Sequence, residues 1–304
     1  MIIMKHKLKG SLALTLATII WGSTFVAQSV GMDHIGPFTF QSIRCALAVI
    51  GLLPVIMLVD KRRHDGQNFR SRWKDKKLWK AGLLCGIPLF LACNLQQLGI
   101  VDTDAGKSAF LTAMYIVIVP LLGIFLKKKP SKTIPLCVVL AVIGLYCLSC
   151  VGVTRISYSD LLLLACALMF AVQIICVDLF ACTVDPLRLN VLQAGVCAAL
   201  STIIALFTEQ IQWQSILDCW LPLCYAGFLS MGAAYSLQII GQRSLESTTA
   251  SLIMSLESVF AVIFGMLILG EQLSGWEIIG CILVFTAVIL SQIPIKSLKQ
   301  TTNT

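Results

Sequence analysis

The sequence predicts an all-α membrane protein in which ten transmembrane helices form two inverted five-helix repeats around a central cavity. Three observations lead to this fold class. Hydrophobic residues make up 58% of the 304 residues and charged residues only 12%, whereas soluble domains have about 25% charged residues. Apolar runs of roughly 18–24 residues, long enough to cross a bilayer core, recur along the chain. Polar positions of the first half also recur in the second half.

Ten apolar runs have the length of a transmembrane helix. The first follows Lys5, Lys7 and Lys9, as a signal peptide would. Its apolar part exceeds the about 7–15 residues of a signal-peptide core and no small-residue cleavage site follows, so we expect a retained helix. The predicted spans are 8–30, 37–59, 78–100, 105–126, 133–152, 160–181, 187–207, 219–241, 248–269 and 276–294. What lies outside them is too short for a soluble domain.

The net charge of +8 is distributed as in a membrane protein. With the N-terminus inside, twenty Lys and Arg residues fall on the cytoplasmic side, and Lys107 and Arg155 on the other. This bias places both termini in the cytoplasm. The basic segment at 70–77 (RSRWKDKK) is then a topology anchor and a candidate contact for anionic lipid. The sequence therefore predicts a multi-pass protein of the inner, cytoplasmic membrane, with no nucleic-acid partner.

The cysteine and histidine residues do not form a recognisable catalytic or metal site. Almost all of the thirteen cysteines fall within spans, where they act as small apolar residues, and Cys147 and Cys150 form a lone CxxC. His6, His34 and His64 all lie outside the spans, which excludes a Ser–His dyad or an HExxH zinc site inside the membrane. No GxxxxGK[ST] loop is present for ATP hydrolysis. We expect no enzymatic activity, no cofactor and no metal.

The first span carries a polar stripe. Trp21 and Gln28 share one helical face with Thr18 and Thr24. The stripe either lines a pathway, with Trp21 against an apolar or aromatic solute, or packs this helix against its neighbours. We favour the lining.

The second span contains Gln41 and Arg44, which are neighbours on a helix because they are three residues apart. Arg44 lies seven residues past Pro37, about 10 Å inside the outer edge. At that depth an Arg side chain either extends back to the interface or faces the protein interior. Position alone leaves both alternatives open.

The third and fourth spans contribute further polar groups. The third span ends with amides at Asn94, Gln96 and Gln97. These three side chains cannot all face lipid, because an unpaired amide there is costly. In the fourth span, Thr112 and Tyr115 lie on one face.

The second half repeats the first. A shift of 149 residues places Pro37, Gln41 and Arg44 over Pro186, Asn190 and Gln193, and a shift of 142 places Leu95, Gln96 and Gly99 over Leu237, Gln238 and Gly241. Five spans is an odd number, so the second copy crosses the membrane upside down. The sequence therefore predicts inverted repeats at 8–152 and 157–294, with a binding site near the midplane between them.

The ninth span has a single acid, Glu257, near the midplane. An ionisable group at that depth is costly unless it faces a polar interior or a partner. Tyr115 occupies the corresponding place 142 residues earlier. Three roles for Glu257 stay open: a proton-coupling site, a counter-charge to a substrate amine or to Arg44, and a hydrogen-bonded packing acid. Its axial offset from Arg44 is about 8 Å, which a long Arg side chain can nearly bridge.

Polar groups gather in eight spans and avoid the fifth and tenth, which we expect to lie outside the cavity. The predicted lining residues are Trp21, Gln28, Gln41, Arg44, Asn94, Gln97, Thr112, Tyr115, Gln173, Gln193, Tyr235, Gln238 and Glu257.

Several short motifs follow one another along the chain: WGSTF at 21–25, Arg44 after Pro37, FLTA at 110–113 with Val119-Pro120, SLESVF at 255–260 and LGE at 269–271. Taken in order, they resemble the drug/metabolite transporter superfamily, and specifically its EamA-type ten-helix exporters. The resemblance extends over about residues 9–294 and implies transport of small organic solutes, commonly export of amino acids or other metabolites. Two departures stand out. Ser258 replaces the proline that often follows the acid, which predicts a straighter helix, and lysines at 127–129 replace an acid at the end of the fourth span.

The leading functional hypothesis is a secondary transporter or facilitator that exports a small amino acid, metabolite or drug by alternating access. The alternative is a membrane-embedded enzyme acting on a lipid-linked substrate. A passive channel or assembly subunit fits less well, because inverted repeats naturally provide two alternating gates. The expected partners are a small-molecule solute and the lipid bilayer. Protons and a homodimer remain open.

Overall fold

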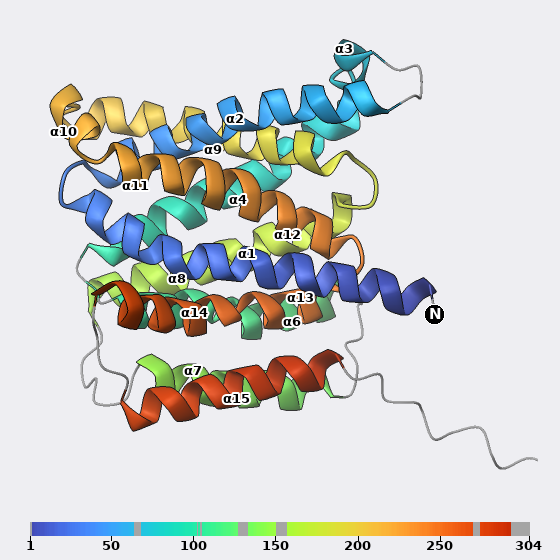
Figure 1. Cartoon of the computed structure of the whole chain (residues 1–304), viewed down its shortest axis with the longest axis vertical. Helices are drawn as coiled ribbons and strands as arrows, with labels where there is room; N and C mark the ends of the chain where they lie inside the picture. Colours follow the sequence, from blue (N-terminus) through green and yellow to red (C-terminus); the bar gives the residue numbers. More distant parts are fainter. Residues whose placement is uncertain are drawn as a thin grey trace, which may run out of the picture.

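The computed structural model describes residues 2–63, 68–101, 103, 105–126, 133–149, 157–269 and 274–292. The helices, with π-helical segments marked η, are α1 (Ile2–Met32), α2 (Pro37–Arg62), α3 (Phe69–Arg72), α4 (Lys76–Ile100), α5 (Ala105–Ala113), α6 (Tyr115–Phe125), α7 (Ile134–Ser149), α8 (Tyr158–Phe180), α9 (Pro186–Thr208), α10 (Trp213–Asp218), α11 (Trp220–Cys224), η1 (Tyr225–Ala234), α12 (Tyr235–Gln242), α13 (Ser247–Met254), α14 (Leu256–Phe264), η2 (Gly265–Leu269) and α15 (Gly275–Gln292). Figure 1 shows them as a layered bundle of roughly parallel and antiparallel rods.

The helices confirm the predicted all-helical membrane fold. In the described part of the chain, nine helices are long and apolar enough to cross a membrane, and the shorter apolar helix Ile134–Leu148 occupies the fifth predicted span. Several predicted features fall outside the described residues: the cations at 127–129 and 132, Cys150, Arg155, the motif end at 270–271, and the cations at 296 and 299.

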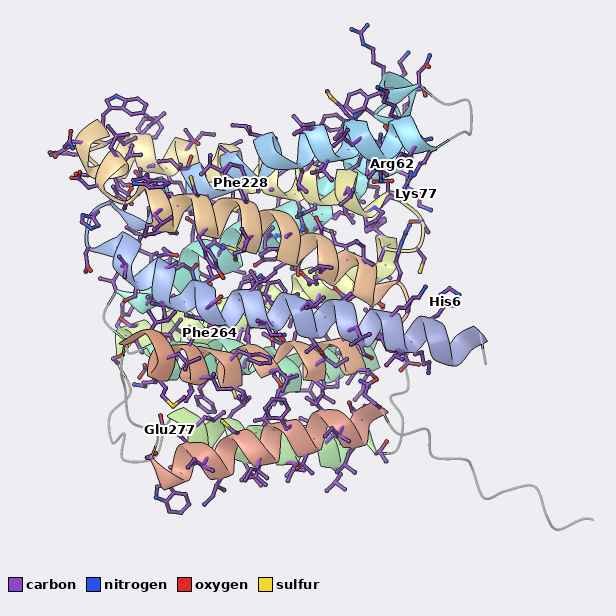
Figure 2. All side chains as sticks on the ribbon, viewed as in Figure 1. His6, Arg62, Lys77, Phe228, Phe264 and Glu277 are labelled. Atoms are coloured by element: carbon purple, nitrogen blue, oxygen red, sulfur yellow. The ribbon has the colours of Figure 1, made fainter. Side chains whose placement is uncertain are left out.

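The two ends of the bundle differ in charge. Figure 2 shows His6, Arg62 and Lys77 at one end and Glu277 at the other. The start of α1, the short helix α3 and the end of α15 all lie at the first of these ends (Figure 1). We call it the basic end and the other the opposite end.

Two of the long spans are interrupted at matching places. The fourth span breaks at Met114 and the ninth at Ser255, where the amides of Val117 and Ser258 bond three residues back, at 3.0 and 3.2 Å. Such i-to-i+3 bonds tighten a helix locally. The ninth span is interrupted although it contains no proline, and the straighter helix that Ser258 predicts stays a prediction. Both breaks lie just before a polar residue, Tyr115 or Glu257.

The same close packing recurs in both halves. A Cβ atom on Gly241 would lie 2.6 Å from Leu14 Cγ, and a Cβ atom on Gly99 would lie 2.6 Å from Leu163 Cγ. Gly241 follows Gly99 by 142 residues and Leu163 follows Leu14 by 149, the two shifts that align the halves. Helix α4 thus packs against α8 as α12 packs against α1. Glycine at each crossing lets the helices approach closely.

Helices α7 and α15 form a separate pair at one edge of the bundle (Figure 1). They cross at Gly144 and Gly280, where a Cβ atom on either glycine would lie within 2.9 Å of the other's carbonyl oxygen. Apolar side chains such as Leu136, Ile143 and Ile282 are exposed on the pair. The fifth and tenth spans are therefore peripheral, as expected from their apolar sequences.

Candidate functional site

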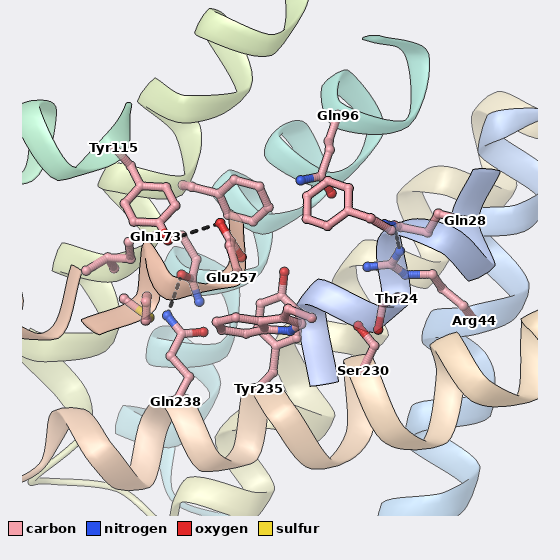
Figure 3. A pocket seen from close by; sticks show the side chains of 15 residues that line it. Thr24, Gln28, Arg44, Gln96, Tyr115, Gln173, Ser230, Tyr235, Gln238 and Glu257 are labelled. Carbon is pink, nitrogen blue, oxygen red and sulfur yellow. Dashed lines mark hydrogen bonds between the residues drawn. The ribbon is translucent and has the colours of Figure 1, made fainter. Parts of the chain in front are cut away.

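A cavity lined by polar, aromatic and apolar side chains lies between the helices of the two halves (Figure 3). Its lining residues come from α1, α2, α4, α6, α8, η1, α12, α13 and α14, and they are Trp21, Thr24, Phe25, Gln28, Arg44, Gln96, Tyr115, Phe170, Gln173, Ile174, Ser230, Tyr235, Gln238, Met254 and Glu257. The cavity volume is about 40 Å³. That volume holds about three water molecules, which is too little for an organic solute.

Arg44 supplies the cation of this cavity. It is only 2% exposed, and its guanidinium donates a hydrogen bond to the Gln28 side-chain oxygen. Of the two alternatives for Arg44, the structure shows the inward-facing one. Its Nε atom has no hydrogen-bond partner among the described residues. A buried, unpaired N–H group costs roughly 1–3 kcal/mol, so this guanidinium retains capacity for a ligand.

Glu257 supplies the acid. The Tyr115 hydroxyl donates to Glu257 Oε1 at 3.1 Å, and the two residues are 142 positions apart. Equivalent positions of the two halves therefore meet each other. Arg44 and Glu257 make no ion pair in the described structure, and Figure 3 shows them on different sides of the cavity. The suggested counter-charge contact between Glu257 and Arg44 is therefore wrong for this state.

Aromatic rings occupy the space between these charges. The Trp21 and Tyr235 rings meet edge to face with centroids 5.0 Å apart. The Tyr235 hydroxyl lies 3.7 Å from Cys93 Sγ, and this pair is also 142 residues apart. The Trp21 indole Nε1 is buried without a partner among the described residues. The aromatic pair thus adds apolar ring surface and, among the described residues, a second unpartnered donor in addition to the Arg44 Nε atom.

A chain of amides leads from the cavity into α9. Gln238 Nε2 donates to Gln173 Oε1 at 3.0 Å and is also 3.1 Å from Gln242 Oε1. Gln173 Nε2 donates to Gln193 Oε1 at 3.2 Å, and Gln193 Nε2 to Asn190 Oδ1 at 2.9 Å. Gln238 Oε1 has no partner within the described structure, which leaves one acceptor facing the cavity.

The structure brings together some of the predicted lining residues and separates others. Trp21, Gln28, Arg44, Tyr115, Gln173, Tyr235, Gln238 and Glu257 line the cavity. Gln41, Asn94, Gln97, Thr112 and Gln193 do not belong to its lining. Their side chains are buried between helices: Gln41 donates to the sulfur atoms of Cys45 and Cys197, for example, and Asn94 to Ser201.

Several lining residues were missed by the prediction. Gln96 faces the cavity although its neighbour Gln97 does not, and only the rotation of α4 decides between two adjacent amides. Thr24 was placed on the polar stripe but was not selected as a lining residue. The apolar members, such as Phe25 and Phe170, carry no sequence signal, because most apolar residues in a span face lipid or other helices.

Among the described residues, no group of three or more His, Cys, Asp and Glu side chains is arranged to hold a metal ion. The charged groups that line the cavity are Arg44 and Glu257. The arrangement is suited to recognise complementary charges and ring surface on a small solute.

A model of the EamA-like transporter family matches residues 8–150 and 157–292. The chain belongs to this family. It is a multi-pass membrane transporter, as its apolar helices also indicate.

Relatives of this EamA-family chain carry transporter names. An uncharacterized transporter of Archaeoglobus fulgidus is 30% identical over 290 residues, which cover 93% of this chain and 86% of that protein. The uncharacterized transporter YoaV of Bacillus subtilis is 22% identical over 298 residues, covering 93% and 96%. A crystal structure of a protein at 18% identity matches with a TM-score of 0.74 over 93% of this chain and 96% of that chain. This last likeness concerns the fold alone.

Proposed function

We propose that this EamA-family protein is a secondary transporter or facilitator that exports a small organic solute by alternating access. Two inverted repeats, 8–152 and 157–294, rock about the central cavity in this proposal. The repeated packing at Gly99 and Gly241 and the meeting of Tyr115 with Glu257 support it. Inverted repeats around a midplane site are common in secondary transporters.

We infer that the solute carries both an acidic and a basic group, as an amino acid does. The observation that carries this inference is one cavity with a buried cation, Arg44, and a buried acid, Glu257, on different sides. Arg44 Nε and Trp21 Nε1 are donors without partners in the described structure, which suits a carboxylate. Glu257 and Gln238 Oε1 supply acceptors for an amine. The Trp21 and Tyr235 rings offer a surface for an apolar side chain.

The small cavity volume fits a state in which the helices around the site lie too close together for a solute. Sites for small molecules usually enclose about 300–1,000 Å³, against about 40 Å³ here. A solute therefore enters only after helices move apart. This requirement supports a carrier cycle more than an open channel.

Flux into liposomes that contain the purified protein tests this proposal. We expect uptake of aromatic and apolar amino acids to exceed that of the matched amines without a carboxylate, and of the matched acids without an amine, by at least about tenfold, a difference of roughly 1.4 kcal/mol. A panel in which no solute crosses faster than in protein-free liposomes would contradict the transporter proposal. Turnover of a lipid-linked substrate in the same liposomes would favour the enzyme alternative.

The proposed location is the cytoplasmic membrane, with the basic end and both termini in the cytoplasm. Single cysteines introduced into a cysteine-free background test it. We expect an impermeant thiol reagent added to intact cells to label the 210–218 segment but not the 62–80 segment. Labelling at Arg70 from outside would overturn the orientation and with it the inverted-repeat proposal.

A further inference from the structure

Helices α2 and α9 lie side by side (Figure 1). Carboxylate contacts tie their ends together at each end of the pair. At the basic end, Asp60 in the last turn of α2 accepts a hydrogen bond from Arg188 in the first turn of α9. At the opposite end, Glu209 follows α9 and accepts hydrogen bonds from the Phe38 and Thr39 amides at 2.9 and 2.8 Å. The Thr39 hydroxyl donates to the same carboxylate at 2.6 Å.

The two ties occupy equivalent positions in the two halves. Glu209 follows Asp60 by 149 residues, and Arg188 follows Thr39 by the same 149. This is the shift that places α2 over α9. Asp60 therefore contacts the residue of α9 that corresponds to Thr39, and Glu209 contacts the residue of α2 that corresponds to Arg188. Such a match is expected if both ties come from one ancestral contact across the interface between halves.

The chemistry of the two ties differs. The Asp60 carboxylate pairs with a full cation, and both side chains are almost buried, at 8% and 2% exposure. The Arg188 guanidinium also lies over two rings, 5.8 Å from the Phe69 centroid and 5.5 Å from that of Trp73. These contacts connect the short helix α3 to the tie.

Among the described residues, no cation pairs with Glu209 in the opposite-end tie. Glu209 binds the amides at the start of α2, where the partial positive charge of a helix N-terminus favours an anion. Gly36 makes room for it: a Cβ atom there would lie 2.3 Å from the Glu209 carboxyl carbon. A larger residue at this position would displace the carboxylate.

We propose that Asp60 and Glu209 are a pair of latches, each of which must release before the cavity opens at its own end. Arg44 on α2 lines the cavity, and Gln193 on α9 accepts a hydrogen bond from the lining residue Gln173. Separation of α2 from α9 at one end therefore loosens the cavity wall toward that end. With both latches closed, the cavity is narrow, as observed. This proposal rests on the alternating-access function above. It assigns Asp60 and Glu209 as positioning residues that set which side is open.

Distance measurements between spin labels test the latches in the full-length protein. Lys61 with Thr183 reports on the basic end and His34 with Gln210 on the opposite end, because all four side chains are exposed near the ties. Labels carried on unnatural amino acids leave the thirteen native cysteines in place. We expect Asp60→Asn to raise the open population at the basic end at least about tenfold and to leave the opposite-end distance unchanged. Glu209→Gln should do the reverse.

Matched controls separate a latch from a general effect of lost charge. Asp75→Asn removes an acid that caps α4 near the basic end, and Glu277→Gln removes one that bonds within the start of α15. Neither acid joins the two halves, so neither variant should change the label-to-label distance at the basic end or at the opposite end. If the Asp60 and Glu209 variants match these controls, or if each changes both ends equally, the latch proposal is wrong.

Asp185, just before α9, pairs with Arg188 at 3.5 Å and with Arg63 after α2 at 2.9 Å. Arg63 is 40% exposed, and an exposed ion pair contributes little. Loss of Asp60 beside the buried Arg188 can also impair folding. The double variant Asp60→Asn with Arg188→Gln removes both charges and should still open the basic end. An unchanged basic-end distance in the folded double variant would overturn the proposal for that end. The distance measurement needs no solute. An absence of flux in liposomes would therefore count against the proposed function, but it would not decide whether Asp60 and Glu209 act as latches.

Discussion

Glu257→Gln is expected to reduce transport of amine-bearing solutes at least about tenfold. The substitution removes the carboxylate that lines the cavity but keeps the size of the side chain and its capacity for hydrogen bonds. Removing one partner of a buried charge contact typically costs roughly 2–5 kcal/mol. The measurement is solute binding and flux in liposomes across a pH series, with and without an imposed proton gradient.

The pattern of loss distinguishes the roles left open for Glu257. Weak binding at every pH indicates a counter-charge to the substrate amine. Retained downhill flux that no longer depends on pH indicates proton coupling. A variant that behaves like the parent in every condition leaves the packing role, in which Glu257 holds Tyr115 across the two halves.

Tyr115→Phe is the matched control for this experiment. It removes the hydroxyl that donates to Glu257 but leaves the carboxyl group in place. We expect a smaller effect than that of Glu257→Gln, because one hydrogen bond to a charged group contributes roughly 1.5–3 kcal/mol and the carboxylate itself stays in the cavity. Equal losses in both variants would indicate that the contact between the halves matters more than the charge.

Arg44→Gln is expected to reduce transport of carboxylate-bearing solutes at least about tenfold. The guanidinium is buried, lines the cavity and contacts Gln28, and its Nε atom has no partner among the described residues. Arg44→Lys should recover only part of the activity, because an ammonium group cannot reproduce the two-pronged donor geometry of a guanidinium.

Substrate pairs make this prediction specific. Arg44→Gln should reduce transport of the amino acid much more than transport of the matched amine. Glu257→Gln should reduce transport of the amino acid much more than transport of the matched acid. Gln28→Ala serves as the neighbouring control, since it removes the acceptor of Arg44 but no charge. Equal loss for all three solutes in Arg44→Gln would argue for a role in folding or in the motion of α2 rather than in recognition.

The sequence by itself determined the membrane class and the approximate spans, because the bilayer requires long apolar segments and makes each intramembrane charge costly. It also singled out Glu257 and Tyr115 as corresponding positions 142 residues apart, and Arg44 as a cation that needed an explanation. These features depend on composition and order along the chain. They do not require knowledge of how any helix is rotated about its axis.

The tertiary structure decided which polar groups share the cavity. Gln96 lines it whereas Gln97 is buried elsewhere, and Arg44 bonds Gln28 rather than Glu257. Helix rotation and tilt produce these choices, and they are set by close crossings such as those at Gly99 and Gly241. Hydropathy cannot reveal such crossings, because a buried apolar face and a lipid-facing one have the same composition. The ties at Asp60 and Glu209 likewise became visible only when α2 and α9 were seen side by side.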